Sequence, residues 1–399
     1  MTSETSAAQR GFEVWSATPT PFKPRKRGEK LEPNFDDIPA LVQQHQRLGV
    51  DGVFLFGTCG EGTMMTPQQK RQFLVALRSD CLPEHYSPQI SVQVTDTSYT
   101  KVIENMEVLL NPPIHAIPVI APPETRFRNP QYVEEYYDQS IAWAAQRHIP
   151  VGIYIIDYPG TPEISVELWH SIISKPVVSL VKNSSPRQEI SKMLLHAVED
   201  RIVGGIMPQL KIYTGHEFDV VDILAYHTLE SRGITMISYD GAVLGGGILI
   251  AGMIREAIET LNNGSIVDAE RMQDRVNKFL EDLYGPLPEI PNWLRALKNA
   301  LVQANIFSSD ELHLAYHPLT AEEEARVARA LAREKEFIGK HYNTLINCKN
   351  IGSLRTFNIY AAVRRLFNTI YNSSKTKIMR DTPLFNRGYK ISIKQLFSA

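Results

Sequence analysis

The sequence predicts an α/β fold, a (β/α)8 or TIM barrel followed by a helical C-terminal subdomain. Eight short, apolar, β-branched runs recur along the chain. Most of them are apolar on both faces rather than alternating, which is typical of fully buried parallel strands. The starts of successive runs lie 26 to 39 residues apart, which leaves room for one helix and two loops between each pair. Eight buried strands alternating with helices favour a barrel.

The eight runs are the expected strands of this barrel. They are FEVWSATPTPF from residue 12, DGVFLFGT from 51, QISVQVTD from 89, HAIPVIAP from 115, PVGIYIID from 150, PVVSLVKN from 176, IVGGIMPQ from 202 and ITMISYDG from 234. A doubly wound open sheet is the rival architecture. Such a sheet usually has fewer strands, and no G-x-G-x-x-G sequence follows the first run.

The segments between the runs carry helix signals. The segment 34–49 starts with Asn34 as a cap candidate and stops at Gly49. The segment that follows the second run has Thr66 as its N-cap and Pro67 at the first helical position. Both signals place a helix directly after a predicted strand.

Further helices are expected beyond the eighth run. They cover about 245–262, 266–284, 291–305 and 320–340, and the last opens with a capping box from Thr320 to Glu323. One of these helices completes the barrel as its eighth helix, and the others are additional to the barrel. We therefore expect the barrel over 11–262, a C-terminal helical subdomain over 263–344, and a basic extension over 345–399.

The composition is that of an ordinary globular protein. The chain has 399 residues, of which 43% are apolar and 22% are charged. The polar N-terminus MTSETSAAQRG has no apolar signal core, and no stretch reaches the roughly 18 to 20 apolar residues of a membrane span. The three cysteines, Cys59, Cys81 and Cys348, are odd in number and far apart, which indicates neither a disulfide framework nor a zinc site. A cytoplasmic location is the expectation.

The extension differs in charge from the rest of the chain. It holds ten Lys or Arg and one acid, whereas residues 1–344 hold 32 basic and 43 acidic residues. Five apolar residues fall on one helical face, with Arg364 and Arg365 beside it: Ile359, Val363, Leu366, Phe367 and Ile370. A basic amphipathic helix can lie on an anionic membrane surface or on a partner. The alternatives are a helix packed on its own barrel and a poorly ordered extension.

The reactive groups of such barrels sit at the carboxyl ends of strands, and the sixth run ends with Lys182. A lysine at a strand end is most often simply solvated. A dry barrel mouth, however, disfavours the ammonium form of a lysine. The neutral amine can attack a ketone to form an imine, and the protonated imine withdraws electrons so that an adjacent C–C bond can break or form. Lys182 is therefore the candidate nucleophile.

Such a reaction also needs a proton carrier and a seat for a carboxylate. Tyr154 in the fifth run can carry a proton. The alternative is a core tyrosine whose hydroxyl has a structural hydrogen-bond partner. The second run leads into GTCGEG, residues 57–62, whose backbone N–H groups can hold an anion. An ordinary glycine-rich turn is the alternative. No G-K-[ST] follows, so the loop is not a Walker loop.

Together these segments resemble the dihydrodipicolinate synthase / N-acetylneuraminate lyase family of class I, Schiff-base-forming aldolases. The family's G-[ST]-T-G-E loop is similar to GTCGEG, its strand-five Y-N-x-P to YIIDYP, and its strand-six K-x-[AS]-[ST] to KNSS. The segments ATPTPF and YTGHEFD are also similar to family segments. The resemblance spans roughly residues 11 to 340, with the motifs in the family's order.

The resemblance implies a role for each matching position. Lys182 would form the imine, Tyr154 would donate and accept the proton, and Thr58 would relay protons by a hydrogen bond to Tyr154. Thr58 would also help to hold the substrate carboxylate, together with Gly57 and the backbone N–H of Cys59. The family has Thr or Ser where Cys59 stands, so one side-chain contact is in doubt. Ile237, in the expected eighth strand, would contact the methyl group of pyruvate.

Other departures from the family bear on the substrate. YIIDYP carries two extra residues between Tyr and Pro, which makes Tyr158 a rival for the catalytic tyrosine. Tyr154 is preferred because PVGIY aligns from the start of the strand. The synthases place an arginine where this chain has GTPE, and a tyrosine pair where it has APPETRF. Both absences argue against dihydrodipicolinate synthesis and leave a 2-keto acid of the sugar-acid type.

The resulting prediction is a lyase that joins or separates pyruvate and an aldehyde through an imine on Lys182. No metal or other cofactor is expected. The imine withdraws electrons in place of a Lewis-acidic metal, and the predicted strand ends carry no His/Asp/Glu cluster. A 2-keto-sugar-acid dehydratase with the same imine and an inactive, metabolite-binding barrel remain the alternatives. The resemblance implies a homotetramer, and no nucleic-acid partner is expected.

Overall fold

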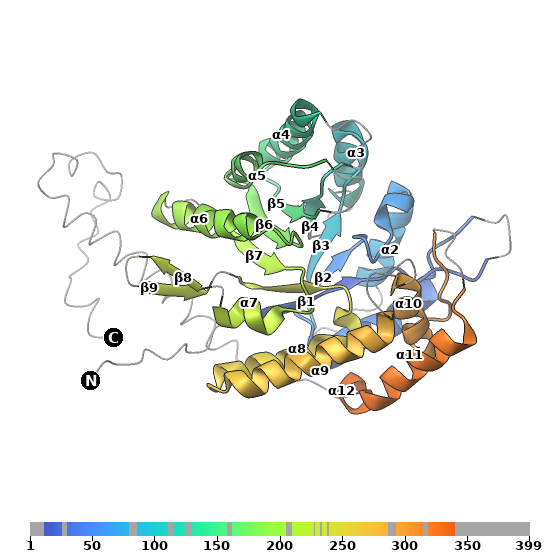
Figure 1. Cartoon of the computed structure of the whole chain (residues 1–399). Coiled ribbons are helices and arrows are strands. Elements are labelled where there is room, and N and C mark those ends of the chain that lie inside the picture. The colour runs from blue at the N-terminus through green and yellow to red at the C-terminus, as the bar shows by residue number, and fades with distance from the viewer. Residues whose placement is uncertain are drawn as a thin grey trace, which may run out of the picture. The chain divides into compact units, whose positions relative to one another are not determined.

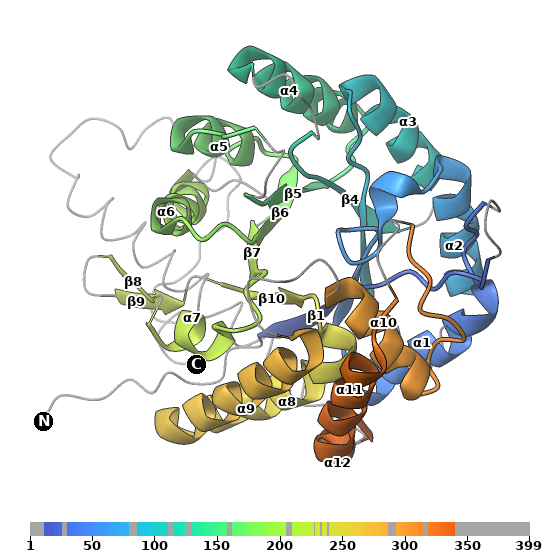
Figure 2. The ribbon, with the colours of Figure 1, turned by 45° about the vertical axis from the view of Figure 1, so that its right-hand side comes forward.

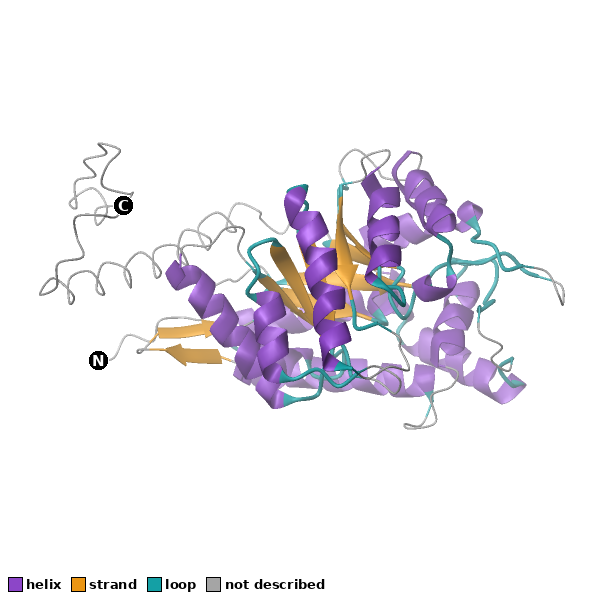
Figure 3. Cartoon of the chain, turned by 90° about the horizontal axis from the view of Figure 1, so that it is seen from above, coloured by secondary structure: helices purple, strands orange, loops and turns teal. Residues whose placement is uncertain are grey.

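Eight parallel strands form a closed barrel, so the predicted α/β barrel is confirmed. The computed structural model describes residues 12–25, 30–79, 86–110, 115–123, 129–157, 162–204, 210–226, 228–231, 234–237, 239–285, 293–313 and 318–339. The strand order around the barrel is β1-β10-β7-β6-β5-β4-β3-β2. The strands are β1 (Glu13–Thr18), β2 (Gly52–Leu55), β3 (Gln89–Gln93), β4 (Ala116–Ile120), β5 (Val151–Ile155), β6 (Val178–Asn183), β7 (Lys211–Thr214) and β10 (Gly241–Leu244). Figure 3 shows the strands inside a layer of helices.

The helices that alternate with these strands cover the outside of the barrel (Figure 1). They are α1 (Ile38–Arg47), α2 (Pro67–Ser79), α3 (Tyr99–Leu110), α4 (Pro130–Gln146), α5 (Val166–Ile173), α6 (Gln188–Gly204), α7 (Val220–Tyr226) and α8 (Gly247–Asn262), with short 3-10 turns η1 (Phe35–Asp37) and η2 (Gly62–Met64). The predicted helix signals are confirmed. Asn34 accepts a hydrogen bond from the N–H of Asp36, and Thr66 Oγ1 accepts one from the N–H of Gln69 at 3.2 Å.

Two barrel strands lie later in the chain than the sequence pattern predicts. The run from residue 202 begins as the end of α6, because Arg201 anchors this helix by donating to the backbone oxygens of Val178 and Ile173. The run from 234 forms β9 (Ile234–Ile237), which pairs antiparallel with β8 (Thr228–Ser231) in a separate two-stranded sheet. The strand that pairs with β1 is β10, and it begins with Gly241. A Cβ on Gly241 would lie 2.3 Å from the backbone oxygen of Glu13.

Packed side chains fill the amino end of the barrel. Glu13 accepts hydrogen bonds from the Trp15 indole at 2.9 Å and the Tyr213 hydroxyl at 2.5 Å, and it pairs with Lys211 Nζ at 2.6 Å. The Trp15 ring lies so close to β2 that a Cβ on Gly52 would come within 2.3 Å of it. A substrate must therefore reach the interior from the carboxyl end of the strands.

The helices after the barrel are also confirmed. They are α9 (Ile266–Tyr284), α10 (Trp293–Gln303), α11 (Ala321–Arg333) and α12 (Lys335–Gly339), and the capping box between Thr320 and Glu323 is formed. The helix α9 packs along α8, and α10 and α11 pack against α9 (Figure 2). None of the helices in the described ranges is both long and apolar enough to cross a membrane. The amphipathic face expected between Ile359 and Ile370 lies outside the described residues.

His45 of α1 should make the stability of the fold depend on pH. Its side chain is buried, and burial lowers its pKa from 6.5 to about 3. The unfolded chain therefore binds this proton at a higher pH than the folded protein does. The free energy of unfolding should fall by about 1.4 kcal/mol for each pH unit below 6.5. Urea unfolding across this range checks the slope, which should be shallower in His45→Gln; equal slopes would contradict the expectation.

Candidate active site

Lys182 lies near the end of β6 and is only 6% exposed. Its Nζ lies 4.3 Å from the ring centroid of Tyr154 on β5 and 4.9 Å from that of Phe54 on β2. On the other side, a Cβ placed on Gly215 would come within 3.1 Å of Lys182 Cε, so the bare backbone makes room for the lysine. The amine thus lies in the barrel's interior, among residues that follow β7 or belong to β2 and β5.

The strand register shows which side chains share a face with the lysine. Tyr154 pairs with Lys182, Lys182 pairs with Tyr213, and Tyr213 pairs with Gly241 of β10. Because side chains alternate along a strand, Val243 follows on the same face as Gly241. The apolar wall that β10 offers to this interior is therefore Val243. Ile237, which was expected in the eighth barrel strand, instead pairs through its backbone with Thr228 in the separate two-stranded sheet.

The GTCGEG loop buries Cys59 and exposes Thr58. Phe56 and Glu61 have positive φ angles of 59° and 50°, and the N–H of Glu61 donates to the Thr58 backbone oxygen at 3.3 Å. Thr58 is thus the exposed residue of this tight turn. No hydrogen bond joins Thr58 to Tyr154 in the described part of the chain, so the predicted relay is not formed. The rival Tyr158 lies outside the described residues.

The backbone of the same loop can hold an anion. The N–H groups of Thr58, Cys59 and Gly60 donate to no other residue that the structure describes. The loop is fixed by Thr20, whose hydroxyl donates to the Gly60 backbone oxygen at 2.7 Å. Gly57 packs so closely that a Cβ there would lie 2.5 Å from the Phe54 ring. Free N–H groups on a fixed loop are what a carboxylate needs.

Glu217, which is not among the predicted site residues, is a carboxyl group on which the charge of Lys182 acts. It follows β7 in the segment YTGHEFD, and it accepts a hydrogen bond from the N–H of Gly246 at 2.7 Å. Burial raises the pKa of Glu217, while the Gly246 N–H, Tyr284 and Lys182 oppose that rise. The available signal was the segment YTGHEFD, which is similar to a family segment and contains this carboxyl.

Cys59 contributes an apolar thiol rather than a nucleophile. Burial raises its pKa to about 12, although the charge of Lys182 opposes this. The thiol is therefore neutral at physiological pH, and a neutral thiol is a poor nucleophile. A Cβ on Gly245 would lie 3.5 Å from Cys59 Sγ and 3.4 Å from Glu217 Oε2. The thiol and the carboxyl therefore both border the bare backbone at Gly245.

The C-terminal helices hold this loop in place. Lys298 of α10 is completely buried and pairs with Glu61 at 2.6 Å. The N–H of His313 donates to the second carboxylate oxygen of Glu61, also at 2.6 Å. The helices beyond the barrel thus contact the loop that carries the proposed anion seat.

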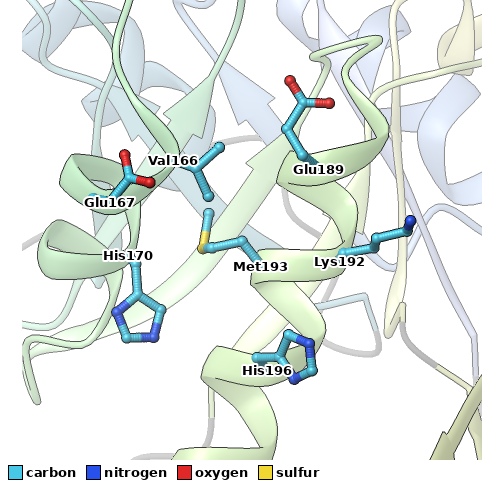
Figure 4. A pocket seen from close by; sticks show the side chains of 7 residues that line it. All are labelled: Val166, Glu167, His170, Glu189, Lys192, Met193 and His196. Carbon is cyan, nitrogen blue, oxygen red and sulfur yellow. The ribbon is translucent and has the colours of Figure 1, made fainter.

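A hollow of about 490 Å³ lies between α5 and α6 (Figure 4). Its walls include His170 from α5 and Met193 and His196 from α6. All of its lining residues come from these two outer helices, and none comes from a strand end. In the described ranges no group of three or more His, Cys, Asp or Glu side chains is placed to hold a metal ion.

Comparison with known proteins finds relatives of one kind. The chain is 23% identical to a 4-hydroxy-tetrahydrodipicolinate synthase of Enterococcus faecalis over 318 residues, which are 80% of this chain and 97% of that protein. It is also 23% identical to a synthase of the same name from Thermoanaerobacter sp. over 267 residues, 65% of this chain and 78% of the relative. No family model matches the chain.

Solved structures share its fold. Dihydrodipicolinate synthase from Bacteroides thetaiotaomicron has a TM-score of 0.63 at 17% identity, covering 81% of this chain and 98% of that one. CdNal from Clostridium difficile, solved in complex with mannosamine, has a TM-score of 0.64 at 15% identity, covering 82% and 99%. A prophage protein of the dihydrodipicolinic acid synthase family from E. coli K12, in complex with pyruvate, has a TM-score of 0.63 at 15% identity, covering 81% and 98%.

Proposed function

Since this chain resembles the dihydrodipicolinate synthase / N-acetylneuraminate lyase family in sequence and has the same barrel fold, we propose that it is a Schiff-base lyase acting through Lys182. The observation that carries the proposal is the burial of the Lys182 amine beside the Tyr154 ring, with the loop of Thr58, Cys59 and Gly60, whose N–H groups donate to no other described residue. A buried amine at a strand end, with no carboxylate in ion-pair contact among the described residues, is placed to add to a bound ketone.

The proposed reaction starts with a 2-keto acid such as pyruvate. Its carboxylate binds the N–H groups of Thr58, Cys59 and Gly60, which brings the ketone carbon to Lys182. The amine adds to this carbon, water leaves, and the protonated imine draws electrons from the neighbouring carbon. Tyr154 serves as the proton carrier for the loss of water, without the Thr58 relay. The resulting enamine adds to an aldehyde, and the reverse reaction cleaves the same C–C bond.

The second substrate is proposed to be an aldehyde of the sugar-acid type. The segment GTPE lacks the arginine that the synthases have there, and the segment APPETRF lacks their tyrosine pair. Both absences support a substrate other than that of the synthases. A dehydratase using the same imine would release water from a 2-keto-sugar acid without releasing pyruvate. Pyruvate release from a panel of 2-keto-3-deoxy sugar acids distinguishes the two. A homotetramer is proposed on the same resemblance.

Borohydride trapping tests the imine. The protein is incubated with pyruvate and sodium borohydride, and the adduct is mapped by mass spectrometry of peptides. The expected result is one reduced adduct, on Lys182. Lys70 is an internal control, because it is also buried and its pKa is lowered to about 8, but it lies on α2 outside the site. No adduct, or an adduct on Lys70 as strong as that on Lys182, would overturn the proposal.

A further inference from the structure

We propose that Glu217 is a second catalytic residue, the base that removes a methyl proton from the imine that pyruvate forms with Lys182. The inference rests on the proposed function and adds a proton acceptor to it. It starts from the absence of the Thr58–Tyr154 hydrogen bond among the described residues. That absence leaves the site with a nucleophile but without the expected proton relay.

Glu217 and Tyr154 come from the strands on either side of β6, which carries the lysine. In the barrel, β6 stands between β5, which carries Tyr154, and β7, which leads to Glu217. The lysine stem passes over Gly215, two residues before Glu217, and the charge of Lys182 acts on the Glu217 carboxyl. An imine on Lys182 would therefore have a phenol on one side and a carboxyl on the other. Two separate proton carriers can serve two different proton transfers.

The surroundings of Glu217 fix the carboxyl in place. Its Oε2 accepts from the Gly246 N–H at 2.7 Å, and Gln273 Nε2 of α9 donates to its backbone oxygen at 3.0 Å. Oε2 lies 3.4 Å from the position of a Cβ on Gly245. Since Gly245 has no side chain, the carboxyl stands over a bare strand end beside the apolar wall of Val243. That wall is where a methyl group would fit.

The charge of this carboxyl suits a reversible proton transfer. No ion pair to Glu217 is found among the residues the structure describes, and burial raises its pKa. A carboxyl with a raised pKa can take up a proton and return it. The carboxylate of a bound substrate at the neighbouring loop would raise it further, because like charges disfavour ionisation.

The proposed step conserves atoms and electrons. The Glu217 carboxylate takes a proton from the methyl carbon of the protonated imine. The electron pair of the broken C–H bond forms the C=C bond of the enamine, and the C=N π pair returns to nitrogen. The enamine carbon then attacks an aldehyde or takes the proton back.

Exchange of pyruvate methyl protons with deuterium, followed by proton NMR, tests this step without knowledge of the aldehyde. Wild-type exchange should rise with pH through the raised pKa of Glu217. Glu217→Gln keeps the size of the side chain and an oxygen for the Gly246 N–H, but it cannot hold the proton. This variant should still be trapped by borohydride on Lys182, while exchange falls on the order of 10²- to 10⁴-fold and loses that pH dependence.

Two control variants separate catalysis from structure. Tyr284→Phe removes a hydroxyl that lowers the pKa of Glu217, so the rise in exchange should move to higher pH. Asp157→Asn removes another carboxylate at the same end of the barrel, one that pairs with Arg187 at 3.2 Å, and should leave exchange unchanged. If Glu217→Gln forms the adduct and exchanges protons at the wild-type rate, the inference is overturned. If the wild type forms no adduct, the proposed function fails and this step fails with it.

Discussion

Replacing Lys182 with methionine is expected to abolish the borohydride-trapped adduct and to lower exchange of the pyruvate methyl protons on the order of 10⁴-fold or more. Methionine keeps the length of the apolar stem over Gly215 but has no nitrogen to bond carbon. Both measurements report the imine itself, so they do not depend on the identity of the aldehyde. An adduct that survives in Lys182→Met would place the imine on another lysine and contradict the assignment.

The same variant should remain folded. Lys182 is 6% exposed, and its ammonium form must lose most of its hydration to lie between the Tyr154 and Phe54 rings. An apolar side chain of similar volume avoids that cost, so the thermal midpoint should stay the same or rise. Lys182→Arg is the matched control, because it keeps the cation near the rings and cannot form an imine. Loss of activity in both variants, with the fold intact, assigns the loss to the amine.

The sequence predicted the barrel because buried parallel strands and helix caps leave local signals. Runs of β-branched residues mark six of the eight strands, and the caps at Asn34, Thr66 and Thr320 mark helix starts. The last two strands were misplaced because local hydrophobicity does not specify a partner. Ile234–Ile237 is a strand, but it pairs with β8 outside the barrel, and Gly241–Leu244 takes the place beside β1.

The site was predicted where it depends on strand position and missed where it depends on loop shape. Tyr154 and Lys182 are direct register partners, which follows from their places on adjacent strands. Thr58 makes no hydrogen bond to Tyr154 among the described residues, in a loop that has positive φ angles at Phe56 and Glu61. Glu217 acquires its setting from Gly246 and α9, which are distant in sequence. Val243 was missed for the same reason as β10.

The buried ion pair between Glu61 and Lys298 should dominate the stability of the region around the loop. Lys298 is 0% exposed and Glu61 is 4% exposed in their side chains, and Lys298 Nζ also donates to the Glu311 backbone oxygen at 2.9 Å. Lys298→Met leaves the Glu61 carboxylate buried without its partner. The free energy of unfolding should fall by about 3 to 5 kcal/mol. Denaturant unfolding measures this loss.

A double-variant cycle separates the ion pair from packing. Glu61→Gln with Lys298→Met removes both charges, so it should recover most of the stability that either single variant loses. The surface pair of Lys278 and Asp282 is a matched comparison, because Lys278 is 61% exposed and the two lie 2.9 Å apart. Lys278→Met should cost less than about 1 kcal/mol. Equal losses of unfolding free energy in Lys298→Met and Lys278→Met would contradict the expectation that burial makes the Glu61–Lys298 pair the stronger contributor to stability.

The pair also links the C-terminal helices to the proposed chemistry. Glu61 comes directly after the three residues whose N–H groups are proposed to bind the substrate carboxylate, and its φ of 50° is unfavourable for a residue with a side chain. Without the attraction of Lys298, the loop loses an interaction that offsets this strain. The double variant should therefore need more pyruvate for half-maximal trapping on Lys182, while the adduct at saturation stays the same. If instead the amount of adduct at saturating pyruvate changes while the half-maximal concentration stays the same, the ion pair acts on Lys182 and not on the binding of the carboxylate.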